Sequence, residues 1–268
     1  MQTTTTQPQD IGGHLREWRQ RRRMTQMDLA LEAEISTRHL SFVETGRAHP
    51  SREMVLHLCD RLGVPLRDRN TLLIAAGYAP VYAQRPLTDP ALQHARAAVD
   101  LVLKGHEPYP ALALDRHWTL VNANSAVAPL LAGADALLLK PPVNVLRLSL
   151  HPQGLAPRIA NLSEWRAHLL ERLRQQIEIT ADATLTALME ELRGYPVPVS
   201  RTPPRSPDAF GGVVAPLQLV TENGALSFFS TTTIFGTPVD VTLSELAIES
   251  FFPADAQTAE ALRRLALD

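Results

Sequence analysis

The residues with the clearest chemical potential lie between Thr25 and Arg47, where hydrogen-bonding side chains gather at the start of a short predicted helix. Ser36 is a candidate N-cap, and Leu40 and Val43 supply the buried face of that helix. Polar side chains at the N-terminal end of a helix suit contact with base edges in the major groove of DNA. The predicted DNA contacts are Gln26, Ser36, Thr37, Arg38, His39, Ser41 and Arg47.

Within this set, two residues lie outside the reading helix itself. Gln26 opens the preceding helix, and we expect it to hold a phosphate and to brace the recognition helix. Arg47 lies in the following loop and is a further phosphate candidate. The alternative interpretation of the whole set is an ordinary polar helix face.

A second group of residues has the types needed for acid–base catalysis or metal binding. His106, Glu107, Asp115 and His117 lie close together in sequence. Asp115 begins a predicted hairpin turn, however, where Asp is expected for backbone reasons. The chain also has no phosphate-binding P-loop, dinucleotide fingerprint, G-x-S-x-G elbow or H-E-x-x-H motif. We therefore expect a protein that is not an enzyme, with no catalytic residue, no cofactor and no metal.

Composition limits the protein further. Cys59 is the only cysteine among 268 residues, which excludes an internal disulfide and a cysteine-based zinc site within one chain. No secretory apolar region opens the chain, and no apolar run reaches the ~18 residues of a membrane span. These features predict a soluble, cytoplasmic protein with no membrane partner.

Charge is unevenly distributed along the chain. Residues 1–82 hold 11 Arg and 9 Asp or Glu, a balance of +2, and the remainder holds 15 basic against 19 acidic residues, a balance of −4. A small basic head on an acidic body fits a nucleic-acid-binding domain joined to a separate second module.

The elements that must position the polar residues form a compact helical group. Two short helices meet at a tight turn at residues 34–35, with Thr25 as the N-cap of the first of them. A preceding helix is expected over residues 11–23, with Leu15 and Trp18 buried and five arginines on a basic face. Ser51 caps a fourth helix, and a fifth covers residues 66–76. The basic face consists of Arg16, Arg19, Arg21, Arg22 and Arg23.

The stretch QMDLALEAEISTRHLSFVETGRAHPS resembles the helix-turn-helix of Cro and phage repressors, the XRE-like type. Glu34 departs from that pattern, because it occupies the turn position where the family usually has Gly, and a positive φ there costs Glu modest steric strain. The resemblance implies an all-α, five-helix, lambda-repressor-like domain that binds double-stranded DNA. The matching residues are Gln26, Leu29, Ala30, Ile35, Ser36, Leu40, Ser41, Glu44 and Gly46.

The second half of the chain mixes helices and strands. A helix is expected from Pro90 to Lys104, followed by short strands over residues 111–115 and 118–122 and a short helix capped by Asn124 and ended by Gly133. Residues 195–207 form a proline-rich loop, and residues 222–224 form the turn of a hairpin. The other expected elements are an apolar segment at 144–150, helices at 164–179 and 184–193, strands at 213–221, 226–235 and 246–252, and a final helix after Asp255.

Strand, turn, strand and a helix opened by Asn-Ala-Asn resemble the start of a PAS domain, a sheet cupped around a ligand cavity. Over nearly the whole chain, the stretches GHEPYPALALDRHWTLVNAN, NVLRLSLHP and ELAIESFFPADAQTAEALRRL after the helix-turn-helix resemble the MmyB-like transcription regulators. That family joins this helix-turn-helix to a PAS-like domain, for which long-chain fatty acids are the implied ligand class. The resemblance implies a transcription regulator that senses an apolar ligand.

The predicted pocket residues are mostly apolar and would be core in any PAS-like domain, so the pocket rests on the resemblance. Arg147 is the one charge inside an apolar run and is a candidate for a ligand carboxylate; a solvated or salt-bridged arginine is the alternative. The predicted lining is Leu112, Leu114, Trp118, Leu120, Asn122, Val127, Leu146, Arg147 and Phe228.

The predicted fold is multidomain: an all-α DNA-binding domain followed by an α+β PAS-like domain. Residues 1–9 are expected to be a disordered tail, 10–82 the DNA-binding domain, 83–90 a linker and 91–268 the ligand-binding domain. Because one helix reads only a few base pairs, we expect a homodimer on an inverted-repeat operator. Two alternatives stay open for the second domain: a module used only for dimerisation or protein interaction, and an enzyme.

Overall fold

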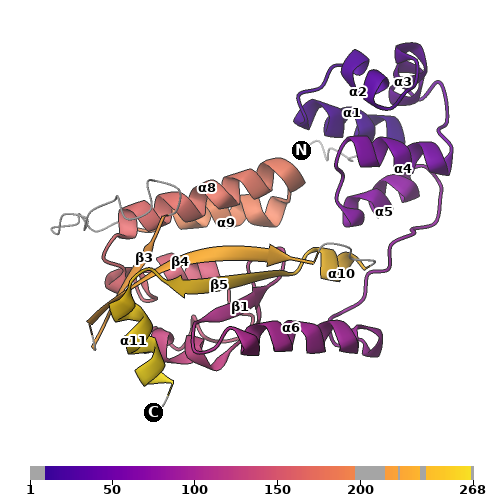
Figure 1. Cartoon of the computed structure of the whole chain (residues 1–268). Coiled ribbons are helices and arrows are strands. Elements are labelled where there is room, and N and C mark those ends of the chain that lie inside the picture. The colour runs from indigo at the N-terminus through magenta and orange to yellow at the C-terminus, as the bar shows by residue number, and fades with distance from the viewer. Residues whose placement is uncertain (1–9, 197–214, 223, 236–239, 267–268) are drawn as a thin grey trace, which may run out of the picture. The chain divides into compact units, whose positions relative to one another are not determined.

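The structure is a computed structural model, and it shows the arrangement of helices and strands in Figure 1. The predicted tail, Asn223 in the predicted hairpin turn, Val213 and most of the proline-rich loop lie outside the described residues. The residues described are 10–196, 215–222, 224–235 and 240–266.

The described residues fall into two compact units. The N-terminal unit holds residues 10–85 together with one short helix from far along the chain, α10 (Val241–Ser244). The C-terminal unit holds the other described residues from Pro86 onward. The chain therefore passes between the units more than once.

Five helices form the body of the N-terminal unit, as predicted. Leu15, Leu29, Leu40 and Leu58 are fully buried in its core, together with Cys59. An all-α domain of this kind buries one apolar face from each helix. The helices are α1 (Ile11–Arg21), α2 (Gln26–Glu32), α3 (Thr37–Glu44), α4 (Arg52–Arg61) and α5 (Leu66–Ala75).

The boundaries of these helices follow the predicted capping residues. The Thr25 hydroxyl accepts from the amide of Asp28, and the Thr25 amide donates to the Asp28 carboxylate, which completes a capping box. Ser36 and Ser51 cap α3 and α4. The turn between α2 and α3 places Glu34 at φ 54°, the left-handed conformation that Gly adopts without strain. The expected steric cost at Glu34 is therefore present.

A glycine lets α1 approach the end of α3 closely. A Cβ on Gly12 would lie 2.6 Å from the carbonyl oxygen of Val43 and 2.7 Å from that of Glu44. These are backbone atoms that cannot turn aside, so only Gly fits this crossing. Gly12 therefore helps to fix α3 against α1.

A five-stranded antiparallel sheet is the centre of the C-terminal unit, with strand order β2-β1-β5-β4-β3. Leu112 and Leu114 alternate with Ala111 and Ala113 along β1, and the two pairs join different buried clusters on the two faces. The sheet with its flanking helices confirms the predicted α+β, PAS-like domain. The strands are β1 (Ala111–Leu114), β2 (Leu120–Ala123), β3 (Leu217–Thr221), β4 (Gly224–Ile234) and β5 (Ala247–Pro253).

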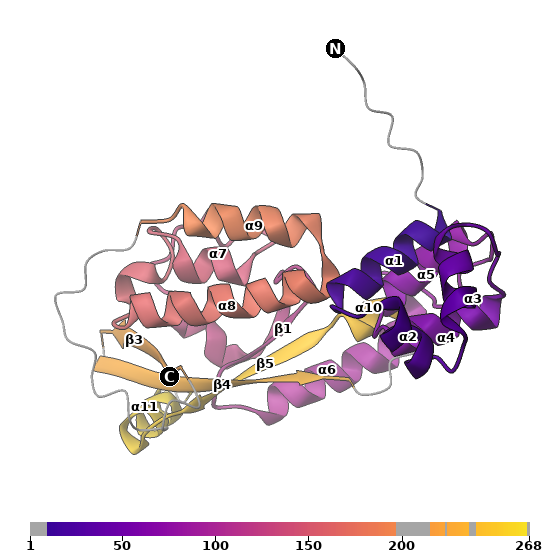
Figure 2. The ribbon, with the colours of Figure 1, turned by 90° about the horizontal axis from the view of Figure 1, so that it is seen from above.

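Helices cover both faces of this sheet. In Figures 1 and 2, α8 and α9 lie side by side over one face, and α6 and α11 lie on the other side. The helices are α6 (Gln93–Gly105), α7 (Val145–Leu150), α8 (Leu162–Thr180), α9 (Ala183–Arg193) and α11 (Ala256–Leu265), with short 3-10 helices η1 (Pro90–Leu92), η2 (Ser125–Leu131) and η3 (Ala156–Arg158).

The structure adds to the predicted elements at two points and corrects them at one. The apolar segment at residues 144–150 is a helix, α7, which Asn144 caps by accepting from the amide of Arg147. Asn124 makes no capping bond; its side chain is buried and bonds the backbone of Leu103, Tyr109 and Ala111. Helix α10 was not predicted, because four residues are too few to show a helical period.

Candidate nucleic-acid interface and apolar core

Helix α3 presents its predicted reading residues at the surface of the N-terminal unit. Ser36, Thr37 and Arg38 are exposed, whereas His39 and Ser41 are half-buried. The Ser36 hydroxyl accepts from the His39 amide at 3.1 Å, so this residue has a structural role as the helix cap. The exposed positions therefore coincide with the N-terminal end of the helix.

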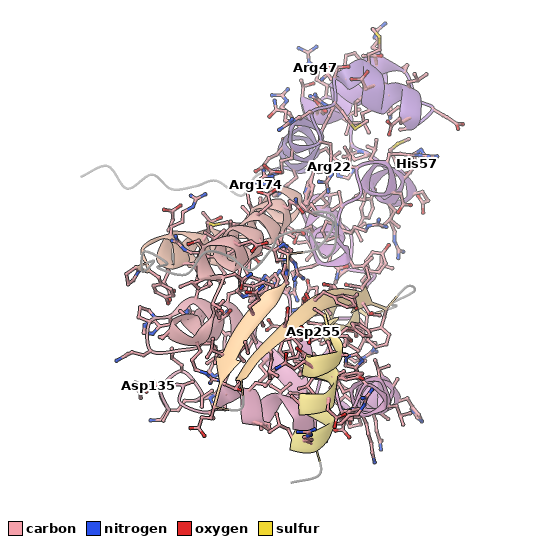
Figure 3. All side chains as sticks on the ribbon, turned by 60° about the vertical axis from the view of Figure 1, so that its left-hand side comes forward. Arg22, Arg47, His57, Asp135, Arg174 and Asp255 are labelled. Carbon is pink, nitrogen blue, oxygen red and sulfur yellow. The ribbon has the colours of Figure 1, made fainter. Side chains whose placement is uncertain are left out.

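Two arginines flank one aromatic ring on α3. The guanidinium of Arg38 lies 5.3 Å from the centre of the Phe42 ring, and that of Arg47 lies 6.0 Å from it. Both side chains are exposed, and Figure 3 shows Arg47 at the outer surface. Stacking on a ring restrains an arginine while its N–H donors stay available.

A buried carboxylate at the end of α3 joins three helices. Arg19 on α1 donates to both oxygens of Glu44, Nε to Oε1 at 2.6 Å and a terminal nitrogen to Oε2 at 2.8 Å. Gln26 on α2 donates to the same Oε2 at 2.8 Å. Burial alone would raise the pKa of Glu44, but the hydrogen bonds from Arg19 and Gln26 and the charges of Arg19 and Arg16 outweigh it and lower that pKa. The recognition helix is thus fixed to α1 and α2.

The predicted basic face of α1 is largely used within the domain. Arg19 is buried, and Arg22, labelled in Figure 3, donates to the backbone oxygens of Leu62 and Gly63. Arg21 pairs with Glu17. The prediction of a five-arginine face is therefore wrong for Arg19, whose place four residues after Leu15 puts it on the inward side of the helix. That spacing was the signal available in the sequence.

In the C-terminal unit, six of the nine predicted pocket residues gather in one buried cluster under α8 and α9. This cluster also contains Trp165 and Leu169 of α8 and Leu188 of α9. The six residues come from β1, β2, α7, β4 and the turn before β2, so the fold brings together positions more than a hundred residues apart. They are Leu112, Leu114, Trp118, Leu120, Leu146 and Phe228.

The structure places the other three predicted pocket residues elsewhere. Asn122 donates to Asp100 of α6 at 2.7 Å, on the opposite face of the sheet. Arg147 is exposed and binds the carboxylate of Glu191 through two nitrogens. Val127 is buried on η2. The salt-bridged alternative for Arg147 is therefore the arrangement observed.

An ion pair that was not predicted from the sequence lies inside the cluster under α8. Arg172 on α8 donates to both oxygens of Glu249 on β5, at 2.8 and 2.9 Å, and to the hydroxyl of Thr232 at 2.8 Å. Its guanidinium lies 4.9 Å from the centre of the Trp118 ring. Burial opposes the charge on Glu249, but Arg172 and the neighbouring hydroxyls lower its pKa. Glu249 lies two residues before Phe251 on β5, so both lie on the same face of the sheet, and that period-two pattern could have identified it.

Comparison with protein-family models finds two matches. A helix-turn-helix domain matches residues 10–72, and the MmyB-like transcription regulator ligand binding domain matches residues 95–265, more than half of the chain. The chain belongs to the MmyB-like transcription regulators. The protein is accordingly a transcription regulator with a DNA-binding domain and a ligand-binding domain, and these families are not enzymatic.

Similar solved structures add little to this assignment. The crystal structure of the clp gene regulator ClgR from Corynebacterium glutamicum is 29% identical, with 38% of this chain and 94% of that chain covered and a TM-score of 0.23. An RNA-binding light-oxygen-voltage receptor is 14% identical, with 97% and 64% covered and a TM-score of 0.25. A search of curated proteins finds no match.

The acid–base candidates of the MmyB-like regulator have separate structural roles. Asp115 accepts from the amides of His117 and Thr119 in the turn before β2. The His106 Nε2 atom lies 2.8 Å from the carbonyl oxygen of Phe251, and the His117 Nε2 atom lies 2.9 Å from the carboxylate of Asp182. The residues that the structure describes contain no group of three potential metal ligands. None of the helices in the described ranges has the length and apolar character to cross a membrane.

Proposed function

We propose that this MmyB-like regulator binds an inverted-repeat DNA operator as a homodimer, with α3 of each copy in the major groove. The observation that carries this proposal is the contrast along α3: Glu44 is fixed by Arg19 and Gln26, while Thr37 and Arg38 at the other end are exposed. A rigid helix with free polar side chains at its N-terminal end suits base reading.

The predicted contacts divide into two classes. Arg38 is the candidate for a guanine, because its planar fork matches two acceptors on that base, and Thr37, His39 and Ser41 supply shorter donors and acceptors. The roles of Ser36, Gln26 and Arg47 would be contacts with the phosphate backbone, which position the helix without selecting a sequence.

The outer face of α6 supports a homodimer. Leu101 is 72% exposed and Val102 45%, and the exposed Ala97 lies one turn before Leu101. The opposite face of α6 already buries Val99 and Leu103 against the sheet. A helix that is apolar on both sides favours a second covering partner, and an uncharged stripe can face its own copy without like-charge repulsion.

The test of DNA binding compares an operator with two half-sites against a single half-site at one fixed salt concentration. Two half-sites about 34–36 Å apart should be bound cooperatively. Leu101→Asp should weaken the two-site operator and lower the dimer fraction measured by light scattering. The control is Gln93→Asp, at an exposed position at the start of the same helix. Equal binding of one and two half-sites by the wild-type protein would contradict the dimer.

For the C-terminal domain, over residues 91–268, we propose one apolar ligand, with a long-chain fatty acid as the leading class. The match of residues 95–265 to the ligand-binding domain of this family supports the proposal, and the apolar cluster of Leu112, Leu114, Trp118, Leu146 and Phe228 would surround the alkyl chain. Burial of an alkyl chain gains ~0.8 kcal/mol per methylene, so a long chain would be retained through purification.

Native mass spectrometry of the full chain tests the ligand directly. We expect an acyl-chain mass that persists after purification and that Leu120→Asp removes, because Leu120 is a half-buried member of the predicted lining. Val121→Asp is the matched control, since Val121 is exposed on the same strand. If no lipid copurifies and added palmitate does not bind, the second domain serves dimerisation or protein interaction instead.

Ligand occupancy should then alter operator affinity by changing the spacing of the two recognition helices. A shift of a few ångströms would misalign one half-site. Couplings between two binding sites typically amount to ~1–3 kcal/mol, a ratio of about 5 to 150 in affinity, and act equally in both directions. Residues 83–90 join the two domains in sequence and offer one path for this signal.

A further inference from the structure

Helix α10 comes from the connection between β4 and β5 but packs within the DNA-binding unit. It contacts α5, and both Asp240 and Val241 are completely buried. A four-residue helix has little stability of its own, so its position depends on these tertiary contacts.

Three backbone contacts dock α10 on the end of the DNA-binding unit. Ala83 forms a parallel bridge with Asp240, and the amide of Val241 donates to the carbonyl of Ala83 at 2.8 Å. The hydroxyl of Thr242 donates to the carbonyl of Arg85 at 2.6 Å. The Arg85 side chain lies 3.5 Å from the Asp240 carboxylate. Residues 83–85 and α10 therefore form one local assembly.

On the other side of each chain crossing, a buried residue anchors the chain in the ligand-binding unit. Leu246 is buried two residues after α10 ends, and Leu87 packs against the same cluster two residues after Arg85. Phe235, directly after β4, packs there as well. Only Pro86 separates Arg85 from Leu87, and only Glu245 separates Ser244 from Leu246.

We propose that α10 is the element through which ligand occupancy reaches the DNA-binding domain, an inference that rests on the proposed ligand-controlled regulation. Beyond Leu246 the chain becomes β5, whose Glu249 and Phe251 face the cluster under α8. A strand rises about 3.3 Å per residue and transmits an axial shift along its length. A displacement of β5 therefore moves α10, and with it α5.

Within the DNA-binding domain the path continues through packed helices. Helix α5 contacts α1, and α1 contacts α3 both at Gly12 and through Arg19. A change in the docking of α10 thus reaches the recognition helix through α5 and α1. The two states of the switch are α10 docked on residues 83–85 and α10 released from them.

The predicted linker, residues 83–90, then has two parts with different roles. Residues 83–85 are partners of α10, whereas Pro86 and Thr88 lie beyond the docked segment and are exposed. If residues 83–90 alone carried the signal, replacing Pro86 and Thr88 by glycine would abolish it. If α10 carries the signal, loosening them leaves most of it intact.

The experiment measures operator affinity of the full chain with and without saturating palmitate, at one salt concentration. Val241→Asp introduces a charge at a fully buried contact and should release α10. Thr242→Ala is a milder second variant that removes only the bond to Arg85. The controls are Ser244→Ala, whose hydroxyl bonds only within α10 in the described contacts, and the double variant Pro86→Gly, Thr88→Gly.

We expect the ratio of operator affinities with and without palmitate to be at least fivefold in the wild-type protein and below twofold in Val241→Asp. The affinity of Val241→Asp for palmitate should be unchanged, and the variant should still bind the operator in one of the two ligand states. Thr242→Ala should reduce the ratio partly, and both controls should keep more than half of it. Hydrogen exchange of the Val241 amide should change when palmitate binds the wild-type protein. A ratio that survives in Val241→Asp and Thr242→Ala overturns the role of α10 and leaves ligand regulation standing. Equal wild-type affinities overturn both.

Discussion

Each unit of this regulator buries one Arg–Glu pair, and the two pairs differ in how closed they are. In the DNA-binding unit, the Glu44 side chain is 0% exposed and Arg19 10%. In the ligand-binding unit, the Glu249 side chain is 5% exposed and Arg172 24%. The first pair joins three helices, whereas the second joins one helix to the middle of a sheet.

This difference separates a fixed part of the molecule from an adaptable one. Arg19 has a third bond, to the carbonyl of Met24, and Glu44 receives Gln26 as well, so both ends of the first pair are held in closed surroundings. Arg172 instead stacks on Trp118 and keeps contact with solvent. A recognition helix needs the first arrangement, because base reading tolerates little movement. A domain that admits a ligand suits the second.

The largest expected effect comes from neutralising the closed pair. Glu44→Gln leaves Arg19 buried without a countercharge and should cost ~3–5 kcal/mol of unfolding free energy. Glu249→Gln should cost less, because Arg172 retains solvent, Thr232 and the Trp118 ring. Denaturant titration measures both losses.

Tryptophan fluorescence assigns each loss to its unit in this first test. Trp18 reports the DNA-binding unit in a variant whose other tryptophans are replaced by Phe. Trp165 reports the ligand-binding unit in a variant in which only Trp18 is replaced, so that the Trp118 ring beside Arg172 is kept. Glu171→Gln is the control, since that carboxylate forms an exposed ion pair with Arg174. A larger loss for Glu249→Gln than for Glu44→Gln would reverse the comparison.

The next effect is the dependence of stability on pH. The pKa of Glu44 is lowered in the folded protein, so this group stabilises the fold above its unfolded pKa of about 4.5. That stability is lost as the pH falls through the lower folded pKa. Glu44→Gln should therefore flatten the acid limb of the Trp18 transition.

The ligand-binding unit supplies the contrast for this pH experiment. The pKa values of Asp182 and Glu191 are lowered in this unit, as is that of Glu249. Burial opposes the charge on Asp182, but the hydrogen bonds from His117 and from a helix N-terminal amide lower its pKa. The pKa of Glu191 is lowered chiefly by Arg147. In Glu249→Gln, the transition reported by Trp165 should therefore still lose much of its stability as the pH falls. Equal flattening in both units would contradict this distribution of carboxylates.

How far the sequence predicted these features depends on how local they are. The caps Thr25, Ser36 and Ser51 are set by side chains that bond the amide three residues further on, and all three were predicted. The turn at Asp115 is equally local. The helix-turn-helix could be identified for the same reason, because its pattern spans one short stretch.

The features that the sequence did not predict depend on distant partners. Arg172 and Glu249 are 77 residues apart, and Asp240 and Arg85 are 155 residues apart. No spacing rule joins such positions. Arg147 shows the same limit: the sequence left open a ligand carboxylate and a salt bridge, because the partner, Glu191, lies 44 residues away.

A third prediction concerns the two arginines beside Phe42, which the structure places alike but whose proposed roles differ. Arg38→Ala should cost ~1–3 kcal/mol of operator binding and relax preference at one base pair in each half-site. Arg47→Ala should weaken all sequences equally and reduce the salt slope by about one phosphate contact. Titration of operator variants at several salt concentrations distinguishes the two. Uniform loss for Arg38→Ala would make it a phosphate contact as well.

The smallest expected effect compares helix caps in the two units. Ser51 accepts from the amide of Met54 at the start of α4, and Asp255 accepts from the amide of Thr258 at the start of α11. Loss of such a cap typically costs ~1 kcal/mol. Asp255→Ala should cost a few tenths of a kcal/mol more than Ser51→Ala, because an anion at a helix N-terminus also interacts with the helix dipole.

The reciprocal exchanges Ser51→Asp and Asp255→Ser are the matched controls, and each should keep most of the stability because both side chains accept the same bond. Denaturant midpoints read from Trp18 and Trp165 show where each loss appears. If the units unfold independently, Ser51→Ala shifts only the Trp18 transition and Asp255→Ala only the Trp165 transition. If Asp255→Ala shifts both, stability lost at α11 is felt in the DNA-binding unit. A shared transition would show that α10 couples the stability of the two units, and it should separate into two when Val241→Asp is added.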